Sequence, residues 1–252
     1  MLRILAIGNS FSEDATKFLH GILAASGIES RVVNLYIGGC SLERHWQNIE
    51  GNKREYQYQL NGIKTDRYVS IEEVLTQENF DVIVTHQASH DSGWACTYEP
   101  FLGLILDYLS EHSDAKIFLN ETWAYEVTSP HPNFMRYERD QEKMFTALKN
   151  AYETAADKHQ LPLIRSGEAI QKIRSLPDFA SGKYCITRDG FHMHFLYGRY
   201  AVALMWAAKT AGIDVLNNGF VPAADFVPGL PAPEEDILKA IRGVVNEIQR
   251  IS

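Results

Sequence analysis

The sequence predicts an α/β protein, a three-layer α/β/α sandwich of flavodoxin-like type with a central five-stranded parallel sheet. Two observations support this. Short apolar runs rich in Val, Ile and Leu have the length of strands buried on both faces. Segments with helical spacing separate them, and right-handed crossovers place such helices on both faces of a parallel sheet. The runs lie at residues 2–7, 31–36, 80–85, 116–119 and 161–165.

The elements follow in order along the chain. The first four runs, LRILAI, RVVNLY, FDVIVT and KIFL, are continuous and apolar enough for inner strands. The fifth, LPLIR, contains Pro162, which lacks a backbone N–H and places this strand at an edge of the sheet. Helices are expected at residues 14–25, 42–58, 99–110, 136–158, 197–211 and 234–248.

Length and composition indicate one ordinary globular domain. The chain has 252 residues, of which 45% are hydrophobic and 22% charged, so it is neither disordered nor collagen-like. The 24 Lys and Arg against 32 Asp and Glu leave a net charge of -8, which disfavours a nucleic acid partner. Because no repeat or linker interrupts the chain, we expect residues 1–252 to form a single catalytic domain.

Cysteine usage and hydropathy indicate a cytoplasmic protein with no membrane partner. Three widely spaced cysteines without a C-x-x-C motif are typical of a reducing compartment. No apolar run approaches the ~20 residues of a membrane span. The amino-terminal apolar stretch is too short for a signal peptide and is expected to be a strand. A signal peptide already removed would leave no trace in this sequence.

Ligands of such sheets bind beyond the carboxyl ends of the strands, and Ser10 lies there after the first strand. A serine at a strand-to-helix turn can face the cleft, where the helix amino terminus favours developing negative charge. Ser10 is therefore a candidate nucleophile. The same residues also fit a helix cap, because Ser10-x-x-Glu13 matches a capping box.

Asp189-Gly190-Phe191-His192 provides a candidate base with its orienting acid. A serine nucleophile needs a base within hydrogen-bond reach, and the base needs a group that orients it. An Asp three residues before a His on one loop can direct its carboxylate at the imidazole Nδ1. The alternative is an ordinary Asp-Gly turn beside a half-buried histidine.

Two more strand ends carry candidate hydrogen-bond donors for an oxyanion. Gly39, after the second strand, can present its backbone N–H without a side chain in the way, although Gly38-Gly39 also fits a plain turn. Gln87, after the third strand, can donate from its side-chain amide, or it can simply connect loops.

The order of these blocks resembles the SGNH (GDSL-like) hydrolases, in a divergent branch. A Gly-x-Ser turn, a glycine loop with Ile37-Gly38-Gly39, an amide side chain and a carboxy-terminal Asp-x-x-His follow one another as in that superfamily. The resemblance implies a cofactor-free carboxylic ester hydrolase with Ser10 as nucleophile, His192 as base and Asp189 as its acid. It also implies an oxyanion hole from the Gly39 and Ser10 N–H groups.

Two departures from that pattern concern Asn9 and the third block. The usual Gly-Asp-Ser is Gly8-Asn9-Ser10 here, which removes a carboxylate beside the nucleophile. The usual Gly-x-Asn-Asp is absent, and the sequence THQAS stands in its place. Gln87 is the natural substitute for the missing Asn, because its amide donates with one more methylene of reach.

The expected substrate is a small-molecule or carbohydrate ester. Trp46, Trp94 and Trp123 lie in the predicted strand-end loops, where aromatic faces suit stacking on a sugar ring, although each can equally be a packing residue. The sequence contains no long amphipathic segment that could form the lid of a long-chain lipase. We therefore expect a small acyl group, such as acetyl, on a carbohydrate or similar polar alcohol.

Two other functions fit parts of the same residues. His86, His90, His192 and His194 could bind a metal in a metal-dependent hydrolase, although no H-E-x-x-H signature is present. A flavodoxin-like binding module could instead hold a phosphate at residues 8–12, although no phosphate-loop consensus is present.

Overall fold

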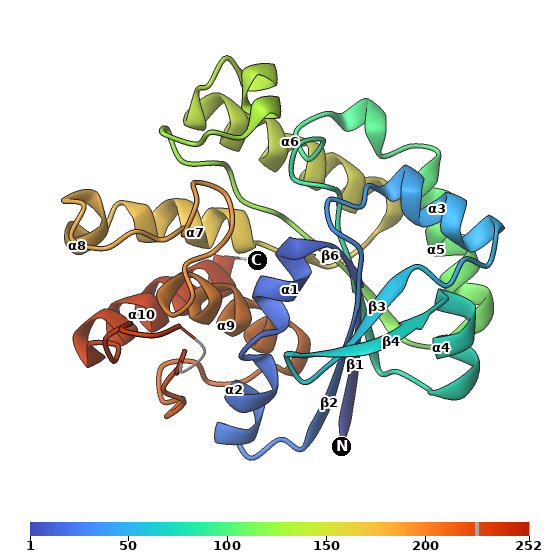
Figure 1. The fold of residues 1–252 in the computed structure, drawn as a ribbon, viewed down its shortest axis with the longest axis horizontal. Helices are drawn as coiled ribbons and strands as arrows, with labels where there is room; N and C mark the ends of the chain where they lie inside the picture. Colours follow the sequence, from blue (N-terminus) through green and yellow to red (C-terminus); the bar gives the residue numbers. More distant parts are fainter. Residues whose placement is uncertain (225–226, 252) are drawn as a thin grey trace.

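The computed structural model describes residues 1–224 and 227–251, and these form a mostly parallel sheet with helices on both faces (Figure 1). The seven strands have the order β4-β3-β2-β1-β5-β6-β7. They are β1 (Leu2–Gly8), β2 (Ser30–Tyr36), β3 (Tyr56–Leu60), β4 (Ile63–Val69), β5 (Val82–Thr85), β6 (Lys116–Asn120) and β7 (Leu163–Ile164).

The five expected strands form the parallel part of the sheet, in the order β2-β1-β5-β6-β7, which confirms the predicted α/β class. Strand β1 lies at the centre, and its residues Ile4–Ile7 are completely buried. The chain first moves outward from β1 to β2 and later returns to β5 on the other side of β1. The carboxyl ends of β1 and β5 therefore flank the switch point at which ligands bind in such sheets.

An antiparallel hairpin of β3 and β4 extends the sheet beyond β2, where the sequence predicted a helix over residues 42–58. Helix α3 (Leu42–Glu50) instead stops at Glu50, with Gly51 as its C-cap. The stretch YQYQL alternates with a period of two, which buries Tyr56 and Tyr58. Asn61 and Gly62 form the two-residue turn with φ of 50° and 75°, as left-handed hairpin turns require.

The helices form two layers. Helices α1 (Ser10–Thr16), α2 (Leu19–Ala25), α7 (Ser166–Arg174), α9 (Tyr197–Ala211) and α10 (Glu235–Ile251) pack together on one face, with the short α8 (Pro177–Ala180) continuing from α7 (Figure 1). Helices α3, α4 (Ile71–Gln77), α5 (Phe101–His112) and α6 (Gln141–His159) cover the other face. In the described residues, no helix has the length and apolarity needed to cross a membrane.

A buried carboxylate joins α1 to the segment that leads into α9. Asp14 is completely buried. Its Oδ1 accepts hydrogen bonds from Arg199 Nε at 2.7 Å and Arg188 Nη1 at 2.9 Å. Its Oδ2 accepts one from the Met193 N–H at 2.8 Å. One carboxylate thus fastens residues 188–199 onto α1, because leaving any of these charges unpaired in the interior is costly.

We expect Asp14→Asn to lower the free energy of unfolding by about 3–5 kcal/mol, because two arginines lose their buried counter-charge. Urea denaturation measures the difference. The matched control is Asp178→Asn, whose carboxylate pairs with Lys183 at 3.3 Å on the surface and is 40% exposed. If the two variants were equally stable, the Asp14 cluster would not hold the fold together.

Candidate active site

Ser10 is the first residue of α1, immediately beyond the end of β1. The cap of this helix is Asn9, whose Oδ1 accepts a hydrogen bond from the Phe11 N–H at 3.0 Å. The capping interpretation of Ser10 is therefore wrong, and its hydroxyl is left for another partner. Gly8, the last residue of β1, lets the buried His86 ring lie close to the backbone, because a Cβ there would lie 2.4 Å from His86 Nε2.

Ser10, His192 and Asp189 form one hydrogen-bonded chain, although Ser10 and His192 are 182 positions apart in the sequence. His192 Nε2 lies 2.9 Å from Ser10 Oγ, and His192 Nδ1 lies 2.7 Å from Asp189 Oδ2. Asp189 Oδ1 also accepts the backbone N–H groups of His192 at 2.8 Å and Phe191 at 3.2 Å. The carboxylate therefore orients both the loop and the imidazole ring.

The surroundings of Asp189 favour its ionised form. Burial alone would raise its pKa, but hydrogen bonds from the His192 ring and from two backbone N–H groups outweigh burial and lower the pKa. Gly190 makes the turn possible with a φ of 90°, and a Cβ there would lie 2.8 Å from the Ser129 backbone. A carboxylate held in this way can stabilise a positive charge on the imidazole.

The turn that contains Gly39 is connected to the hydrogen-bonded residues Ser10, His192 and Asp189 through Asn9. The Cys40 N–H donates to the Ile37 carbonyl at 3.2 Å, and Gly39 at the third position of this turn has a φ of 62°, which favours glycine. Asn9 Nδ2 donates to the Cys40 carbonyl at 3.0 Å. Burial raises the pKa of the Cys40 thiol to about 12, so it stays protonated and is no nucleophile.

The structure contradicts the prediction that Gln87 donates to an oxyanion. Its Nε2 donates to the carbonyl and the hydroxyl of Thr97, at 3.0 and 3.1 Å, which uses both amide hydrogens. Its Oε1 accepts the N–H groups of Leu42 at 3.0 Å and Ala88 at 2.8 Å. Gln87 therefore joins the start of α3 to two parts of the loop that follows β5, which is the loop-connecting alternative.

The three predicted tryptophans have different environments. Trp123 is completely buried, stacks on Phe11 at 4.0 Å and donates from Nε1 to the Phe191 carbonyl at 2.7 Å. It supports the loop that carries Asp189 and His192 and is too buried to stack on a sugar, so that prediction is wrong. Trp46 is half-buried, and Trp94 is 39% exposed with the Arg136 guanidinium 4.4 Å from its ring centre.

An aromatic cluster beside His192 was not predicted from the sequence. The Phe191 ring lies 4.3 Å from that of His192, and His131 packs edge-on against Phe191 at 4.9 Å. Tyr125 lies 4.7 Å from His131. Tyr125 and His131 come from the loop after β6, and Phe191 and His192 come from the loop before α9. Only a pattern of aromatic residues in strand-end loops could have indicated them.

The histidines of the metal alternative do not gather at one point. His86 is buried with Nδ1 3.0 Å from the Gln87 carbonyl, and burial lowers its pKa to about 4. His194 accepts the Leu196 N–H at 3.3 Å, and His90 packs against His131. Residues 1–224 and 227–251 hold no group of three His, Cys, Asp or Glu side chains placed to hold a metal ion. The geometry thus gives the metal-dependent alternative no support.

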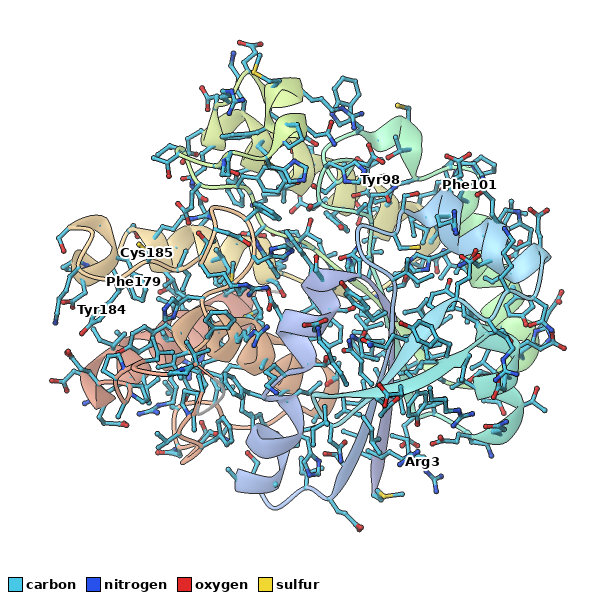
Figure 2. All side chains as sticks on the ribbon, in the orientation of Figure 1. Arg3, Tyr98, Phe101, Phe179, Tyr184 and Cys185 are labelled. Carbon is cyan, nitrogen blue, oxygen red and sulfur yellow. The ribbon has the colours of Figure 1, made fainter. Side chains whose placement is uncertain are left out.

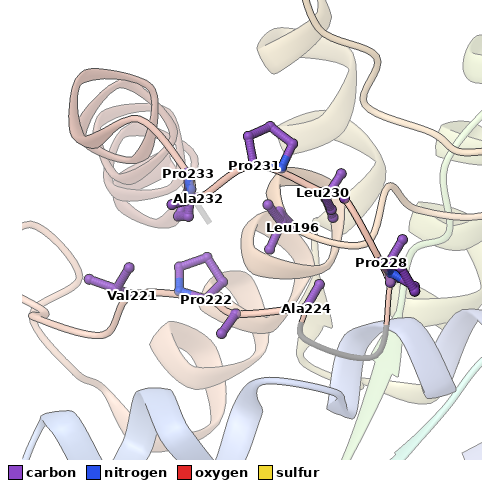
Figure 3. A pocket seen from close by; sticks show the side chains of 12 residues that line it. Leu196, Val221, Pro222, Ala224, Pro228, Leu230, Pro231, Ala232 and Pro233 are labelled. Atoms are coloured by element: carbon purple, nitrogen blue, oxygen red, sulfur yellow. The ribbon is translucent and has the colours of Figure 1, made fainter.

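Two other features lie apart from this chain of hydrogen bonds. A pocket of about 450 Å³ is lined by Leu196 and by residues 221–224 and 227–233, all of which are apolar (Figure 3). All three cysteines are free, and Cys185 lies near Phe179 and Tyr184 at the outer end of α7 and α8 (Figure 2). The described lining of this pocket carries no nucleophile, acid or base.

Comparison with known structures agrees with the fold. A protein from Slackia heliotrinireducens, provisionally described as an SGNH hydrolase, is 20% identical with a TM-score of 0.58, over 82% of this chain and 98% of that one. An acetylxylan esterase from Geobacillus stearothermophilus is 14% identical with a TM-score of 0.54, over 83% of this chain and 94% of that one. The chain therefore has the fold of the SGNH hydrolases, as the resemblance implied.

A more similar structure and a family model define the family. No curated protein matches this sequence. A crystal structure of a DUF4886 family protein from Bacteroides uniformis is 34% identical with a TM-score of 0.88, over 98% of this chain and 93% of that one. The model of the same family, described as a domain of unknown function, matches residues 3–227. The chain belongs to the DUF4886 family.

Proposed function

We propose that this protein is a serine hydrolase that cleaves a carboxylic ester. The observation that carries the proposal is the hydrogen-bonded chain from Asp189 through His192 to Ser10 at the carboxyl ends of the parallel strands. The SGNH-type fold is consistent with this chemistry. Because the chain of hydrogen bonds spans most of the sequence, we also propose that residues 1–252 act as one catalytic domain.

In the proposed mechanism, Ser10 Oγ attacks the ester carbonyl while His192 Nε2 takes the hydroxyl proton. Asp189 stabilises the resulting imidazolium through Nδ1. Collapse of the tetrahedral intermediate breaks the ester bond, and the alcohol leaves with the proton from His192. Water, deprotonated by the same imidazole, then attacks the acyl-enzyme and releases the acid and free Ser10.

We assign the oxyanion hole to the backbone N–H groups of Ser10 and Gly39. The Ser10 N–H lies in the first turn of α1, where N–H groups have no partner within the helix. The Gly39 turn is held beside it through Asn9 and the Cys40 carbonyl. Each such donor commonly contributes about 3–4 kcal/mol to stabilising the transition state.

The proposed substrate carries a small acyl group, such as acetyl, on a carbohydrate or similar polar alcohol. One protein of the same fold is an acetylxylan esterase. Trp94, which is 39% exposed, and the partly buried rings of Phe191 and His131 offer surfaces on which a sugar could stack. Trp46, which is half-buried on α3, is a further candidate for the same role.

We expect Ser10→Ala to lower kcat/KM for an acetyl ester by about 10⁴-fold or more, because the nucleophile is lost. Labelling with a fluorophosphonate probe should disappear in this variant. The matched control is Ser175→Ala, which removes an exposed serine at the end of α7 and should label normally. Normal labelling of Ser10→Ala would rule out Ser10 as the nucleophile.

Asp189→Asn should lower kcat by about 10³–10⁴-fold with little change in stability. The asparagine can still accept the two backbone N–H groups, but its NH₂ would face His192 Nδ1 and force the proton onto Nε2. His192 then cannot accept the Ser10 proton. Steady-state kinetics and urea unfolding measure the two effects, with the exposed Asp114→Asn as control. An active Asp189→Asn enzyme would contradict this role.

A further inference from the structure

A second histidine, His131, lies beside the residues proposed to cleave the ester. Its ring packs edge-on against the Phe191 ring, with the two ring centres 4.9 Å apart. The Phe191 ring lies 4.3 Å from the ring of His192, whose Nε2 is 2.9 Å from Ser10 Oγ. The single ring of Phe191 therefore connects His131 to the proposed base and nucleophile, and the mechanism has so far given His131 no role.

The backbone determines which nitrogen of His131 carries the proton. His131 caps the 3₁₀ helix η2 (Pro132–Tyr137), and its Nδ1 accepts a hydrogen bond from the Asn133 N–H at 3.2 Å. Because a neutral imidazole has one N–H and one acceptor nitrogen, the proton of His131 is on Nε2. Within residues 1–224 and 227–251, this Nε2–H has no hydrogen-bond acceptor, and the residue is half-buried. A bound substrate can therefore accept it.

The His131 ring is uncharged at neutral pH. Burial lowers its pKa, and the positive charges of His90 and His192 lower it further against the opposing effect of Asp189. His131 is thus within electrostatic reach of both partners of Ser10. A neutral donor suits this position, because His192 becomes positively charged in the proposed mechanism and a second cation beside it would oppose that charge.

The neighbours of His131 hold its ring in a defined position. The Tyr125 ring lies 4.7 Å from that of His131 and 5.7 Å from that of Phe191, and the Tyr125 hydroxyl lies 2.8 Å from Ser89 Oγ. The His90 ring stacks on His131 with the ring centres 6.3 Å apart. With these contacts and the cap of η2, His131 presents its Nε2–H from a fixed place, as a residue that selects a substrate must do.

We infer that His131 Nε2–H donates a hydrogen bond to the hydroxyl next to the acylated oxygen of the substrate. The inference rests on the proposed esterase function and narrows its substrate class to monoesters of vicinal diols. A sugar ring stacked on Phe191 would have its leaving oxygen at His192, which protonates it, and its neighbouring hydroxyl toward His131. His131 would then distinguish a sugar ester from an ester of a simple alcohol.

The variant His131→Asn removes the proposed hydrogen bond and keeps the cap. An asparagine side chain readily accepts a hydrogen bond from the backbone N–H two residues on, so it can replace Nδ1 as the partner of Asn133. It is too short to place a donor where Nε2 lies. We therefore expect urea unfolding of His131→Asn to match the wild type. The matched control is His112→Asn, which removes an exposed histidine at the end of α5.

The test compares trans-2-acetoxycyclohexanol with cyclohexyl acetate, two esters that differ by one vicinal hydroxyl. We expect the wild type to prefer the first in kcat/KM, and His131→Asn to reduce this preference about fivefold, mainly through KM, as for the loss of one neutral hydrogen bond. Loss of ring stacking alone would slow both esters equally and leave their ratio unchanged. His112→Asn should keep the preference. An unchanged preference in His131→Asn would overturn the inference.

Nuclear magnetic resonance on Ser10→Ala separates this inference from the proposed function. Added trans-cyclohexane-1,2-diol should shift the nitrogen resonance of His131 Nε2, which is assigned by its loss in His131→Asn, and cyclohexanol should shift it much less. This result would support the inference even if neither ester were hydrolysed, in which case only the esterase proposal would fail. Hydrolysis of both esters by the wild type, with no shift of Nε2 by the diol, would overturn the inference alone.

Discussion

The geometry of the candidate site depends on the buried carboxylate of Asp14. Ser10 sits at one end of α1, while His192 and Asp189 sit on a loop that arrives 182 positions later. Asp14 binds Arg188, the Met193 N–H and Arg199, so it holds both ends of that loop against the helix that carries Ser10. A polar cluster buried this deeply has one favourable arrangement, and this gives the loop a defined position.

The strand-end loops are also joined to one another by side chains that do not face the reacting atoms. Asn9 caps α1 with its oxygen and holds the Cys40 carbonyl with its nitrogen. An aspartate could accept the first hydrogen bond but could not donate the second, which gives Asn9 a structural reason to depart from the usual Gly-Asp-Ser. Gln87 and Trp123 join further loops in the same manner.

The surroundings of Ser10 differ in chemistry from one side to the other. Around His192 the rings of Phe191 and His131 provide flat, partly exposed surfaces. Along α1, Glu13 and Lys17 carry charges instead. The aromatic side is the one that suits the proposed sugar ester, since a sugar ring can stack on aromatic faces.

The sequence by itself determined the five parallel strands and the placement of Ser10, Gly39 and Asp189–His192 at strand ends or on one loop, because these follow from local period and spacing. The hairpin could also have been predicted from the sequence, since YQYQL has the period of a strand and Asn61-Gly62 follows it as a hairpin turn. Only the tertiary structure decided that the Gln87 amide donates to Thr97 and that Trp123 stacks on Phe11. The same holds for the hydrogen bond from Arg188 to the Asp14 carboxylate. A strand-end side chain turns toward whichever distant loop satisfies its hydrogen bonds or covers its surface, and no local pattern specifies that partner.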